Sequence, residues 1–297
     1  MKIIDAHIHY AGWEGFQATA AESGQINSVD GVAENFRRNG VVMAIAMGAG
    51  RDGGDAGFCR PMTPNLAGPV TPEHYGQPAN IAYCAGVDSG AITPENTKRS
   101  LEEFEKYLKT PQCVGLKFYP GYHHLYLSEP RHFPFFELAA AYDVPVVIHT
   151  GDTAGTRGHV KYAHPLTVDE VAVEFPKTRF VLAHYGNPWL VDATEVAAKN
   201  ENVSIDLSGF AAGRIVAADF LKRFRGYFDQ MRIWMDYLGD WDRFLFGTDY
   251  PLVNIDAYID VIRAVVPEEH HEKVFYGNAV RVFSKLGPLL EKLEERP

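Results

Sequence analysis

Four histidines and one aspartate of this chain occupy the same kind of position, at the end of a short apolar run. They are His7 and His9 in DAHIH, His149 in VVIHTG, His184 in VLAHYG and Asp249 in FGTDYP. Any one of them alone has an ordinary explanation, because polar residues at strand ends often form structural hydrogen bonds or cap helices. Neutral imidazoles together with a carboxylate are the ligands of a catalytic zinc or similar divalent ion, which lowers the pKa of bound water to about 7. The five residues together predict a catalytic metal site.

The apolar runs that carry these residues belong to a set of eight, separated by amphipathic segments. Short continuous apolar runs are typical of parallel strands that are buried on both faces. The runs cover residues 2–9, 41–48, 81–88, 113–120, 144–151, 179–186, 203–209 and 243–251. Helical patterns lie between them, for example at 94–109 and 133–142. The alternation predicts an α/β fold, a (β/α)8 TIM barrel, whose active site forms at the carboxyl ends of the strands.

An open doubly wound sheet is the alternative architecture. Such a sheet normally carries a glycine-rich phosphate turn after its first strand, where this chain has His7 and His9. In a strand these two histidines point to the same side, because side chains alternate with a period of two. We expect one domain over residues 1–297, with an amphipathic closing helix after Gly277. A long insertion loop at 49–80, rich in Gly and Pro, is expected to cover the metal.

Composition and charge restrict the class of protein. The formal net charge is −10 and the Lys and Arg residues are scattered, which does not suit a nucleic-acid-binding protein. No segment approaches the ~20 apolar residues that span a bilayer, and the start does not resemble a signal peptide, so a cytoplasmic location is expected. Cys59, Cys84 and Cys113 are odd in number and far apart, which argues against a disulfide framework. The sequence is compatible with a homo-oligomer and does not define the oligomeric state.

In their order along the chain, these motifs resemble those of the amidohydrolase superfamily. DAHIH, IHTG, LAHYG and FGTDYP, followed by YGNAVRVF, are similar to the amidohydrolase-related branch, which includes aminocarboxymuconate-semialdehyde decarboxylase and its hydrolase relatives. The resemblance covers the whole chain. It implies that the metal ligands are His7, His9, His149 and Asp249. It also implies that Asp249 orients or deprotonates the metal-bound water.

The resemblance leaves the number of metal ions open. His184 matches a histidine that either ligates a second metal or acts as an acid/base and electrophile beside the first. Lys117, at the end of the fourth run, stands where two-metal members carry a carboxylated lysine. Alternatively, Lys117 binds a substrate carboxylate or supports His149. Because Lys117 is the only candidate for a bridging ligand, we expect one divalent ion, zinc, rather than two.

Several cationic residues follow strand ends, although the chain is acidic overall. They are Arg51, Arg60, His123, His124, Arg157, Lys161 and Arg214. They predict a small anionic or carboxylated substrate, with Arg157, Lys161 and the ring of Tyr119 in contact with it. The alternative for any one of these residues is a solvated loop charge or, for Tyr119, plain packing.

The predicted function is that of a metal-dependent hydrolase, which attacks the carbonyl of an amide, ester or lactone. Asp249 would take the proton, and His184 or the metal would hold the oxyanion. Non-oxidative decarboxylation of an unsaturated or aromatic acid is the alternative, because it uses the same ligands. A scaffold without activity is disfavoured, since such a protein would be expected to have lost one or more of the five residues.

Overall fold

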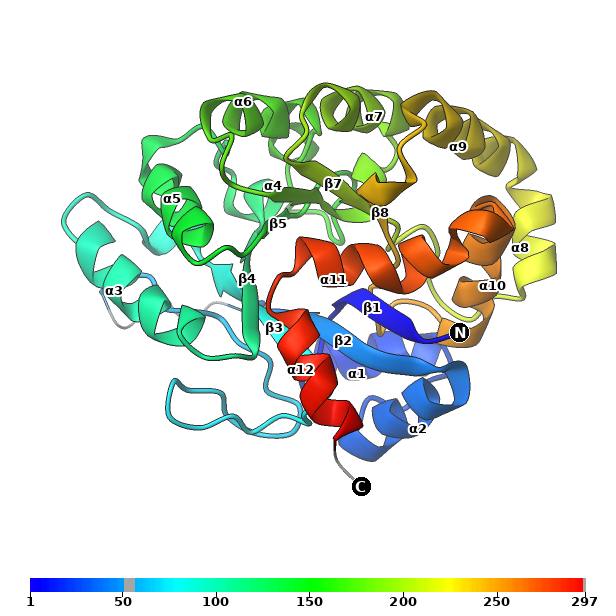
Figure 1. The fold of residues 1–297 in the computed structure, drawn as a ribbon, viewed down its shortest axis with the longest axis horizontal. Helices are drawn as coiled ribbons and strands as arrows, with labels where there is room; N and C mark the ends of the chain where they lie inside the picture. The colour runs from blue at the N-terminus through cyan, green and yellow to red at the C-terminus, as the bar shows by residue number, and fades with distance from the viewer. Residues whose placement is uncertain (51–56, 296–297) are drawn as a thin grey trace.

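The computed structural model describes residues 1–50 and 57–295 of the chain. Eight parallel strands lie in the order in which they occur along the chain, each hydrogen-bonded to the next. They are β1 (Ile3–Ile8), β2 (Val41–Met47), β3 (Ile81–Val87), β4 (Cys113–Phe118), β5 (Val146–Ile148), β6 (Phe180–Leu182), β7 (Val203–Asp206) and β8 (Phe244–Leu245). Helices surround them, so the predicted (β/α)8 barrel is confirmed (Figure 1).

The barrel closes between its last and first strands. The backbone N–H of Ala6 donates to the carbonyl of Phe246 at 2.9 Å, and that of Asp249 donates to the carbonyl of His7 at 2.8 Å. One further parallel bridge joins Ile8 to Tyr250. The segment after β8 therefore completes the sheet at the end of β1 that carries the DAHIH histidines.

All eight predicted runs contain a strand, but the strands of the second half are shorter than predicted. β5 and β6 have three residues each and β8 has two. The runs continue beyond these strands as buried loops, among them 149–151 and 183–186. Burial of the whole run explains why the sequence pattern does not show where each strand ends.

The helices lie between consecutive strands and around the outside of the barrel (Figure 1). They are α1 (Glu14–Glu22), α2 (Val29–Asn39), α3 (Thr97–Leu108), α4 (Pro120–His123), α5 (Phe133–Ala141), α6 (Leu166–Glu174), α7 (Leu190–Lys199), α8 (Ala217–Arg223), α9 (Arg225–Leu238), α10 (Ile255–Val265), α11 (Asn278–Val282) and α12 (Leu286–Glu294). α3 begins three residues later than predicted, because Asn96 accepts from the backbone N–H of Thr93 in a preceding turn. None of the helices in the described ranges is long and apolar enough to cross a membrane.

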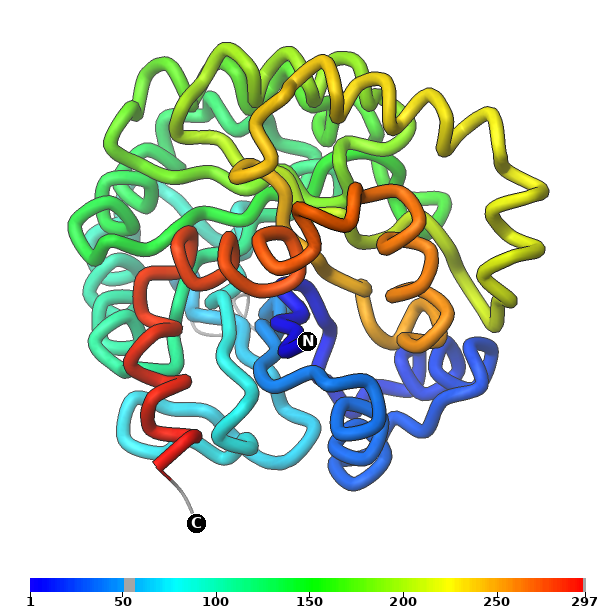
Figure 2. Tube along the Cα trace, turned by 45° about the vertical axis from the view of Figure 1, so that its right-hand side comes forward, coloured from blue at the N-terminus to red at the C-terminus, as the bar shows by residue number. Residues whose placement is uncertain are grey.

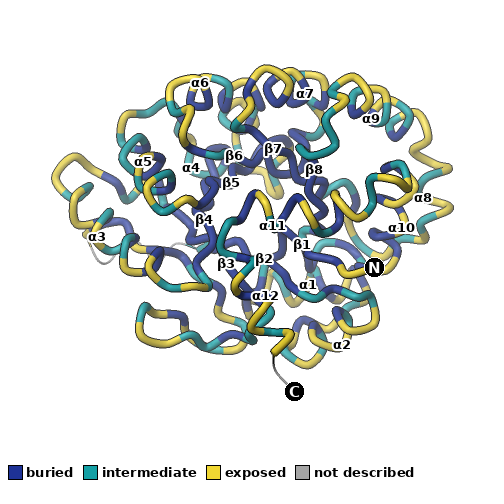
Figure 3. Tube along the Cα trace, viewed as in Figure 1, coloured by how far each residue is buried: buried dark blue, intermediate teal, exposed yellow. Residues whose placement is uncertain are grey.

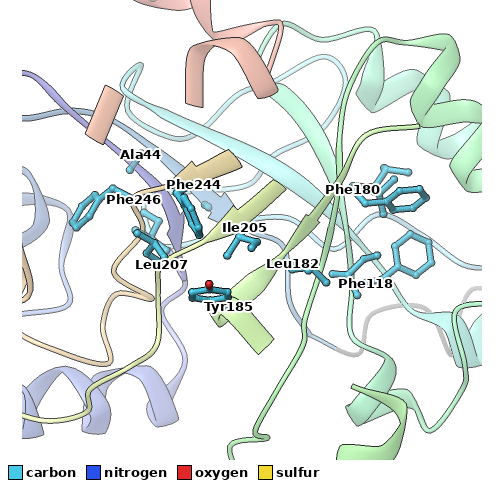
Figure 4. Close-up of a cluster of buried hydrophobic side chains, with 14 of the residues drawn as sticks. Ala44, Phe118, Phe180, Leu182, Tyr185, Ile205, Leu207, Phe244 and Phe246 are labelled. Carbon is cyan, nitrogen blue, oxygen red and sulfur yellow. The ribbon is translucent and has the colours of Figure 1, made fainter. Parts of the chain in front are cut away.

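Buried apolar side chains form two layers on either side of the sheet. The outer layer packs the strands against the helices, and Figure 4 shows Phe118, Phe180 and Ile205 within it. In Figure 3 the buried strands lie inside a more exposed ring of helices. The inner layer includes Val114 and Val147 in the barrel and extends to α11 and α12.

The predicted closing helix after Gly277 consists of two helices, α11 and α12, which are separated near Phe283. Phe283, Leu286 and Leu290 of this segment pack with the inner apolar layer of the barrel. The end of α12 is joined to the N-terminal segment, because Lys2 pairs with Glu294. In Figure 2, α12 is the red segment that leads to the C-terminus. This apolar cover leaves the carboxyl ends of the strands as the open end of the barrel.

The described part of the 49–80 loop contacts β3, α3 and the segment that follows β1, where Asn65 and Leu66 donate to the carbonyl of Tyr10. Met62 exchanges two backbone hydrogen bonds with Gly86, of 2.9 and 3.0 Å. A Cβ atom at Gly86 would lie 2.1 Å from the carbonyl oxygen of Gly48, so this crossing requires glycine. The backbone N–H of Cys59 donates to Ser100 Oγ at 3.1 Å. Residues 51–56 of the expected cover, Arg51 included, lie outside the described residues.

Phe136 of α5 provides a test of the outer layer. Its fully buried ring lies 5.4 Å, between centroids, from the rings of Phe118, Phe175 and Phe180. Phe136→Ala should lower the free energy of unfolding by about 3–5 kcal/mol, because it removes buried surface and leaves a cavity. Equilibrium urea denaturation measures this change. Val173→Ala on α6, where the side chain is exposed, should stay within about 0.5 kcal/mol of wild type. Equal losses in the two variants would contradict the proposed packing.

Candidate metal centre and active site

The five predicted residues come from the carboxyl ends of four strands. His7 lies within β1 and His9 directly after it, His149 follows β5, and Asp249 lies four residues after β8. His184 is in the turn η4 (Ala183–Gly186), which follows β6. The strand ends that the sequence placed on one face of the barrel do bring these side chains together.

Three of the five form the centre of the cluster. One ligand atom from each of His7, His184 and Asp249 lies within 4.8 Å of the other two. His7 Nε2 and Asp249 Oδ1 are buried, make no hydrogen bond within the described residues, and lie 3.7 Å apart. Buried polar atoms without partners are costly and rare. Imidazole nitrogens and a carboxylate oxygen that face one another in this way fit a divalent cation.

His9 and His149 flank this centre on two sides. His9 Nε2 lies 3.2 Å from Asp249 Oδ1, and the His9 ring stacks on Phe16 with 5.0 Å between centroids. His149 Nδ1 lies 3.2 Å from His184 Nε2. His184 therefore stands in the middle of the cluster, next to the residues that the family resemblance implies as ligands. The ligand set His7, His9, His149 and Asp249 remains a prediction.

Asp206, at the end of β7, is a site residue that the sequence analysis missed. Its fully buried carboxylate accepts from His7 Nδ1 at 2.7 Å through Oδ2 and from the backbone N–H of His184 at 3.0 Å through Oδ1. A signal was present in the sequence, because an aspartate inside the apolar run 203–209 satisfies the same strand-end rule as the other residues.

The backbone at two of the five residues is in the left-handed region. The φ angles are 64° at His184 and 58° at Asp249. Such a conformation costs a non-glycine residue on the order of 1–3 kcal/mol and is typical of functional sites. Backbone hydrogen bonds hold both residues: His184 donates to Asp206, and Asp249 donates to the carbonyl of His7. These bonds fix the direction in which each side chain leaves the strand end.

Lys117 lies at the end of β4, fully buried, and its Nζ has no hydrogen-bond partner among the described residues. Burial lowers the pKa of its ammonium to about 8. Burial and the positive charge of Lys117 together lower the pKa of His7 to about 4, despite the opposing effect of Asp206. His7 is therefore neutral near pH 7, which is the form that binds metals.

Asp249 and His184, at the mouth of the barrel, are both in protonation states that can accept a proton. Burial tends to raise the pKa of Asp249, but attraction to the protonated forms of His184 and His9 at acidic pH outweighs this effect, so the pKa of Asp249 lies below the usual range. Burial also lowers the pKa of His184. Near neutral pH, Asp249 is then a carboxylate and His184 a neutral imidazole.

A cavity of about 910 Å³ opens above the cluster. His9, His149, His184 and Asp249 line its inner part, and Phe16, Tyr119 and Tyr122 provide aromatic walls. The hydroxyl of Tyr119 donates to the carbonyl of Gly48 at 2.9 Å, which fixes this ring. Its size and lining suit a small molecule with a planar or apolar part.

The predicted substrate-binding residues occupy different places. Tyr119 and Arg157 line the cavity, together with His123 and His124. Lys161, in the turn η3 (Val160–Tyr162), is exposed and its ammonium packs 4.6 Å from the ring centroid of Tyr162. Lys117 lies behind the cavity wall, 5.1 Å from the ring centroid of Tyr119. From the 49–80 loop, only Ala49 and Gly50 of the described residues line the cavity.

The buried ammonium of Lys117 predicts a pH-dependent stability. The pKa of Lys117 is about 8 in the folded protein and 10.5 when the side chain is unperturbed. Between these two pH values the unfolded chain binds more protons than the folded protein, so the free energy of unfolding rises with pH. Lys117→Met should abolish this rise. In metal-free protein, the free energy of unfolding of wild type should gain about 2 kcal/mol relative to the variant between about pH 7 and about pH 9.5.

Urea denaturation at the two pH values measures this difference. Lys161→Met is the matched control, because this ammonium is exposed, and its pH dependence should follow that of wild type. A constant difference between wild type and Lys117→Met across the pH range would contradict the depressed pKa.

Comparisons with known proteins bear on the fold and the family of this chain. No curated protein sequence matches the chain. Solved structures that share the fold include an uncharacterised TIM-barrel protein from Bordetella bronchiseptica, with 18% identity, a TM-score of 0.66 and coverage of 97% of this chain and 100% of that one. A second is 5-carboxyvanillate decarboxylase from Sphingomonas paucimobilis, with 16% identity, a TM-score of 0.61 and coverage of 95% and 99%. A third is a probable 2-pyrone-4,6-dicarboxylic acid hydrolase from Acinetobacter baumannii, solved with citric acid bound, with 12% identity, a TM-score of 0.58 and coverage of 96% and 100%.

The sequence profile of the amidohydrolase family matches residues 81–285, which is more than half of the chain. This match includes Lys117, His149, His184, Asp206 and Asp249. Together with the eight-stranded barrel, it confirms the family that the motifs suggested: the chain belongs to the amidohydrolase family.

Proposed function

We propose that this chain is a metal-dependent hydrolase that acts on the carbonyl of a small, carboxylated amide, ester or lactone. The observation that carries the proposal is the state of Asp249. Its Oδ1 faces the Nε2 atoms of His7 and His9 at 3.7 and 3.2 Å and makes no hydrogen bond within the described residues. A carboxylate in this position can accept the proton of an attacking water.

The donor set suits one divalent ion, for which we propose zinc. His7 and Asp249 would hold it together with His9 and His149, and His184 lies close enough to take part. Two proteins of similar fold, each 15% identical, were solved with metals: a dihydroxybenzoic acid decarboxylase from Polaromonas with manganese and an amidohydrolase from Burkholderia multivorans with zinc. A divalent ion at such a site polarises a carbonyl and makes water more acidic.

In the proposed hydrolysis, Asp249 would transfer a proton from the attacking water to the leaving group. Water forms a new C–O bond to the carbonyl carbon, and Asp249 takes its proton. The bond from this carbon to the leaving nitrogen or oxygen then breaks, and Asp249 returns the proton to the leaving group. The rigid backbone of Asp249 keeps the carboxylate in place for both transfers.

The aromatic walls and Arg157 support the substrate class. Tyr119 and Tyr122 flank His149, with ring centroids 6.4 and 4.9 Å away, so a flat substrate could lie across the cluster. Arg157 lies on the cavity lining beyond these rings. A guanidinium binds a carboxylate through paired hydrogen bonds, which would orient the carbonyl towards Asp249.

Decarboxylation of an unsaturated or aromatic acid is the second candidate. It is supported by the fold similarity to 5-carboxyvanillate decarboxylase and to 2,6-dihydroxybenzoate decarboxylase. Decarboxylation leaves a carbon that must be protonated, which requires an acid near the reacting atom. An aspartate is a base at neutral pH rather than an acid, and for this reason we propose hydrolysis as the first candidate.

One experiment separates the two reactions. Protein prepared without added chelator should contain about one divalent ion per chain, and its activity should disappear on chelation and return with zinc. A panel of lactones, amides, esters and unsaturated acids in H₂¹⁸O should give a product that carries ¹⁸O, without release of CO₂. Release of CO₂ without ¹⁸O in the organic product would identify a decarboxylase instead.

Asp249→Asn serves as the variant for this assay. Since its amide cannot accept a proton, turnover should fall at least about 10²-fold while the fold is retained, as circular dichroism will show. Near-normal turnover in this variant would eliminate Asp249 as the base. Wild-type protein that binds no divalent ion would remove the basis of the proposal.

The position of Arg157 predicts a second kinetic result. Arg157→Gln should raise KM for carboxylated substrates by about tenfold or more, because it removes a charge-assisted contact of about 1.5–3 kcal/mol. kcat should change little, since the contact is distant from the reacting carbonyl. Lys161→Gln is the matched control, because Lys161 packs on Tyr162 outside the cavity lining. Equal KM changes in the two variants would contradict the role of Arg157, and so would a preference for neutral substrates.

A further inference from the structure

We propose that Asp206 is a positioning residue that fixes the tautomers of His7 and His184, so that both imidazoles present an unprotonated Nε2 to the cluster. The inference goes beyond the five residues of the proposed function and rests on that function only where it involves the metal. It depends on the two oxygens of one buried carboxylate, each of which serves a different histidine.

The first connection runs from Asp206 directly to His7. Oδ2 lies 2.7 Å from His7 Nδ1, and both side chains are shielded from solvent. An ionised carboxylate can only accept hydrogen bonds, so the proton of the neutral imidazole lies on Nδ1. His7 Nε2 is then a free lone pair, and it is one of the buried atoms without a hydrogen-bond partner.

The second connection runs to His184 through Ser208. The hydroxyl of Ser208 donates to Asp206 Oδ1, because the carboxylate cannot donate. The Ser208 oxygen, 2.9 Å from His184 Nδ1, must therefore accept the proton that this ring nitrogen carries. His184 Nε2 is left without a proton on the side that faces the cavity.

The third histidine of the group shows why these tautomers matter. His149 Nε2 lies 2.8 Å from the carbonyl oxygen of Asp152, to which it must donate, so its Nδ1 is also a lone pair. That Nδ1 lies 3.2 Å from His184 Nε2. Two lone pairs at this separation repel each other unless a cation lies within reach of both. The hydrogen-bond network thus directs three nitrogen lone pairs and the Asp249 carboxylate to one region.

Asp206 also holds the backbone around the cluster. Its Oδ1 accepts from the backbone N–H groups of His184 at 3.0 Å and Ser208 at 3.1 Å, besides the Ser208 hydroxyl. Gly209 packs directly on the His184 ring, where a Cβ atom would lie 2.7 Å from Nδ1. The ring of His184 is therefore confined on the side away from the cavity as well.

Two variants address the two connections separately. In Asp206→Asn the amide oxygen should take the Oδ1 place, where three donors converge, so that the NH₂ group faces His7. His7 would then carry its proton on Nε2, while His184 would be unchanged. Ser208→Ala should alter His184 alone, because it removes the acceptor for Nδ1–H and leaves the contact between Asp206 and His7 intact.

Long-range ¹H–¹⁵N correlation spectra of metal-free protein distinguish the two tautomers of each imidazole. His7→Gln and His184→Gln assign the signals. His132, whose Nδ1 bonds to the carbonyl of Leu127, is an internal reference that no variant should change. Asp5→Asn is the matched control, because Asp5 is an equally buried carboxylate whose partners are backbone amides and a hydroxyl rather than imidazoles.

Zinc affinity provides the second measurement. Competition with a chromophoric chelator should show a loss of about 10- to 100-fold in Asp206→Asn, as is usual when the carboxylate partner of a ligating histidine is changed. Ser208→Ala should show a smaller loss. The tautomer spectra do not depend on turnover, so an inactive protein with the expected tautomers would count against the proposed function and not against this inference.

The inference is overturned if wild-type His7 or His184 carries its proton on Nε2. It is also overturned if Asp206→Asn keeps both wild-type tautomers and binds zinc within about threefold of wild type. Should Asp206→Asn not fold, the wild-type spectrum and Ser208→Ala still decide the question, since Ser208→Ala removes a single hydroxyl.

Discussion

The carboxylate of Asp206 is buried in the barrel wall and accepts hydrogen bonds from three segments of the chain. The donors are the ring of His7 in β1, the backbone of His184 after β6, and Ser208 after β7. Burial of a carboxylate is strongly unfavourable unless donors replace its water. Neither histidine can move away without leaving part of that charge unsatisfied. The separation of the two rings, and hence the shape of the cluster, depends on this one group.

A second buried carboxylate, Asp5, holds the opposite side of the cluster. It accepts from the backbone N–H of Thr248 at 2.9 Å and from the Thr248 hydroxyl at 2.6 Å. Burial raises the pKa of Asp5 to about 7, against the lowering effect of these bonds. Asp5 thus joins the middle of β1 to Thr248, the residue just before Asp249. Because β8 has only two residues, the side-chain bonds of Asp5 and the backbone bond from Asp249 to His7 position the Asp249 carboxylate beyond the end of the strand.

The sequence predicted the barrel because every strand is buried on both faces, which leaves continuous apolar runs. It predicted the five cluster residues because the carboxyl ends of parallel strands meet at one edge. It could not predict which atoms face each other. His7 and Asp206 are 199 positions apart, so their pairing follows from barrel closure, whereas His149 and His184 are 35 positions apart and pair because β5 and β6 are neighbours. The sequence likewise could not distinguish Arg157 from Lys161. They lie four positions apart in one loop, and the conformation of that loop determines that Arg157 lines the cavity and Lys161 does not.

The buried ammonium of Lys117 destabilises the fold and also favours the neutral form of the neighbouring histidines. Its ammonium is buried without a hydrogen-bond partner within the described residues, so the folded state pays for its charge. Burial is the main cause that lowers the pKa values of His7, His149 and His184, and the charge of Lys117 adds to this effect. Imidazoles that stay neutral keep their lone pairs, and the hydrogen bonds of Asp206, Ser208 and Asp152 determine where those lone pairs point. Burial, reinforced by the charge of Lys117, therefore maintains the protonation state on which this geometry depends, and the apolar packing of the inner layer offsets the cost of burying that charge.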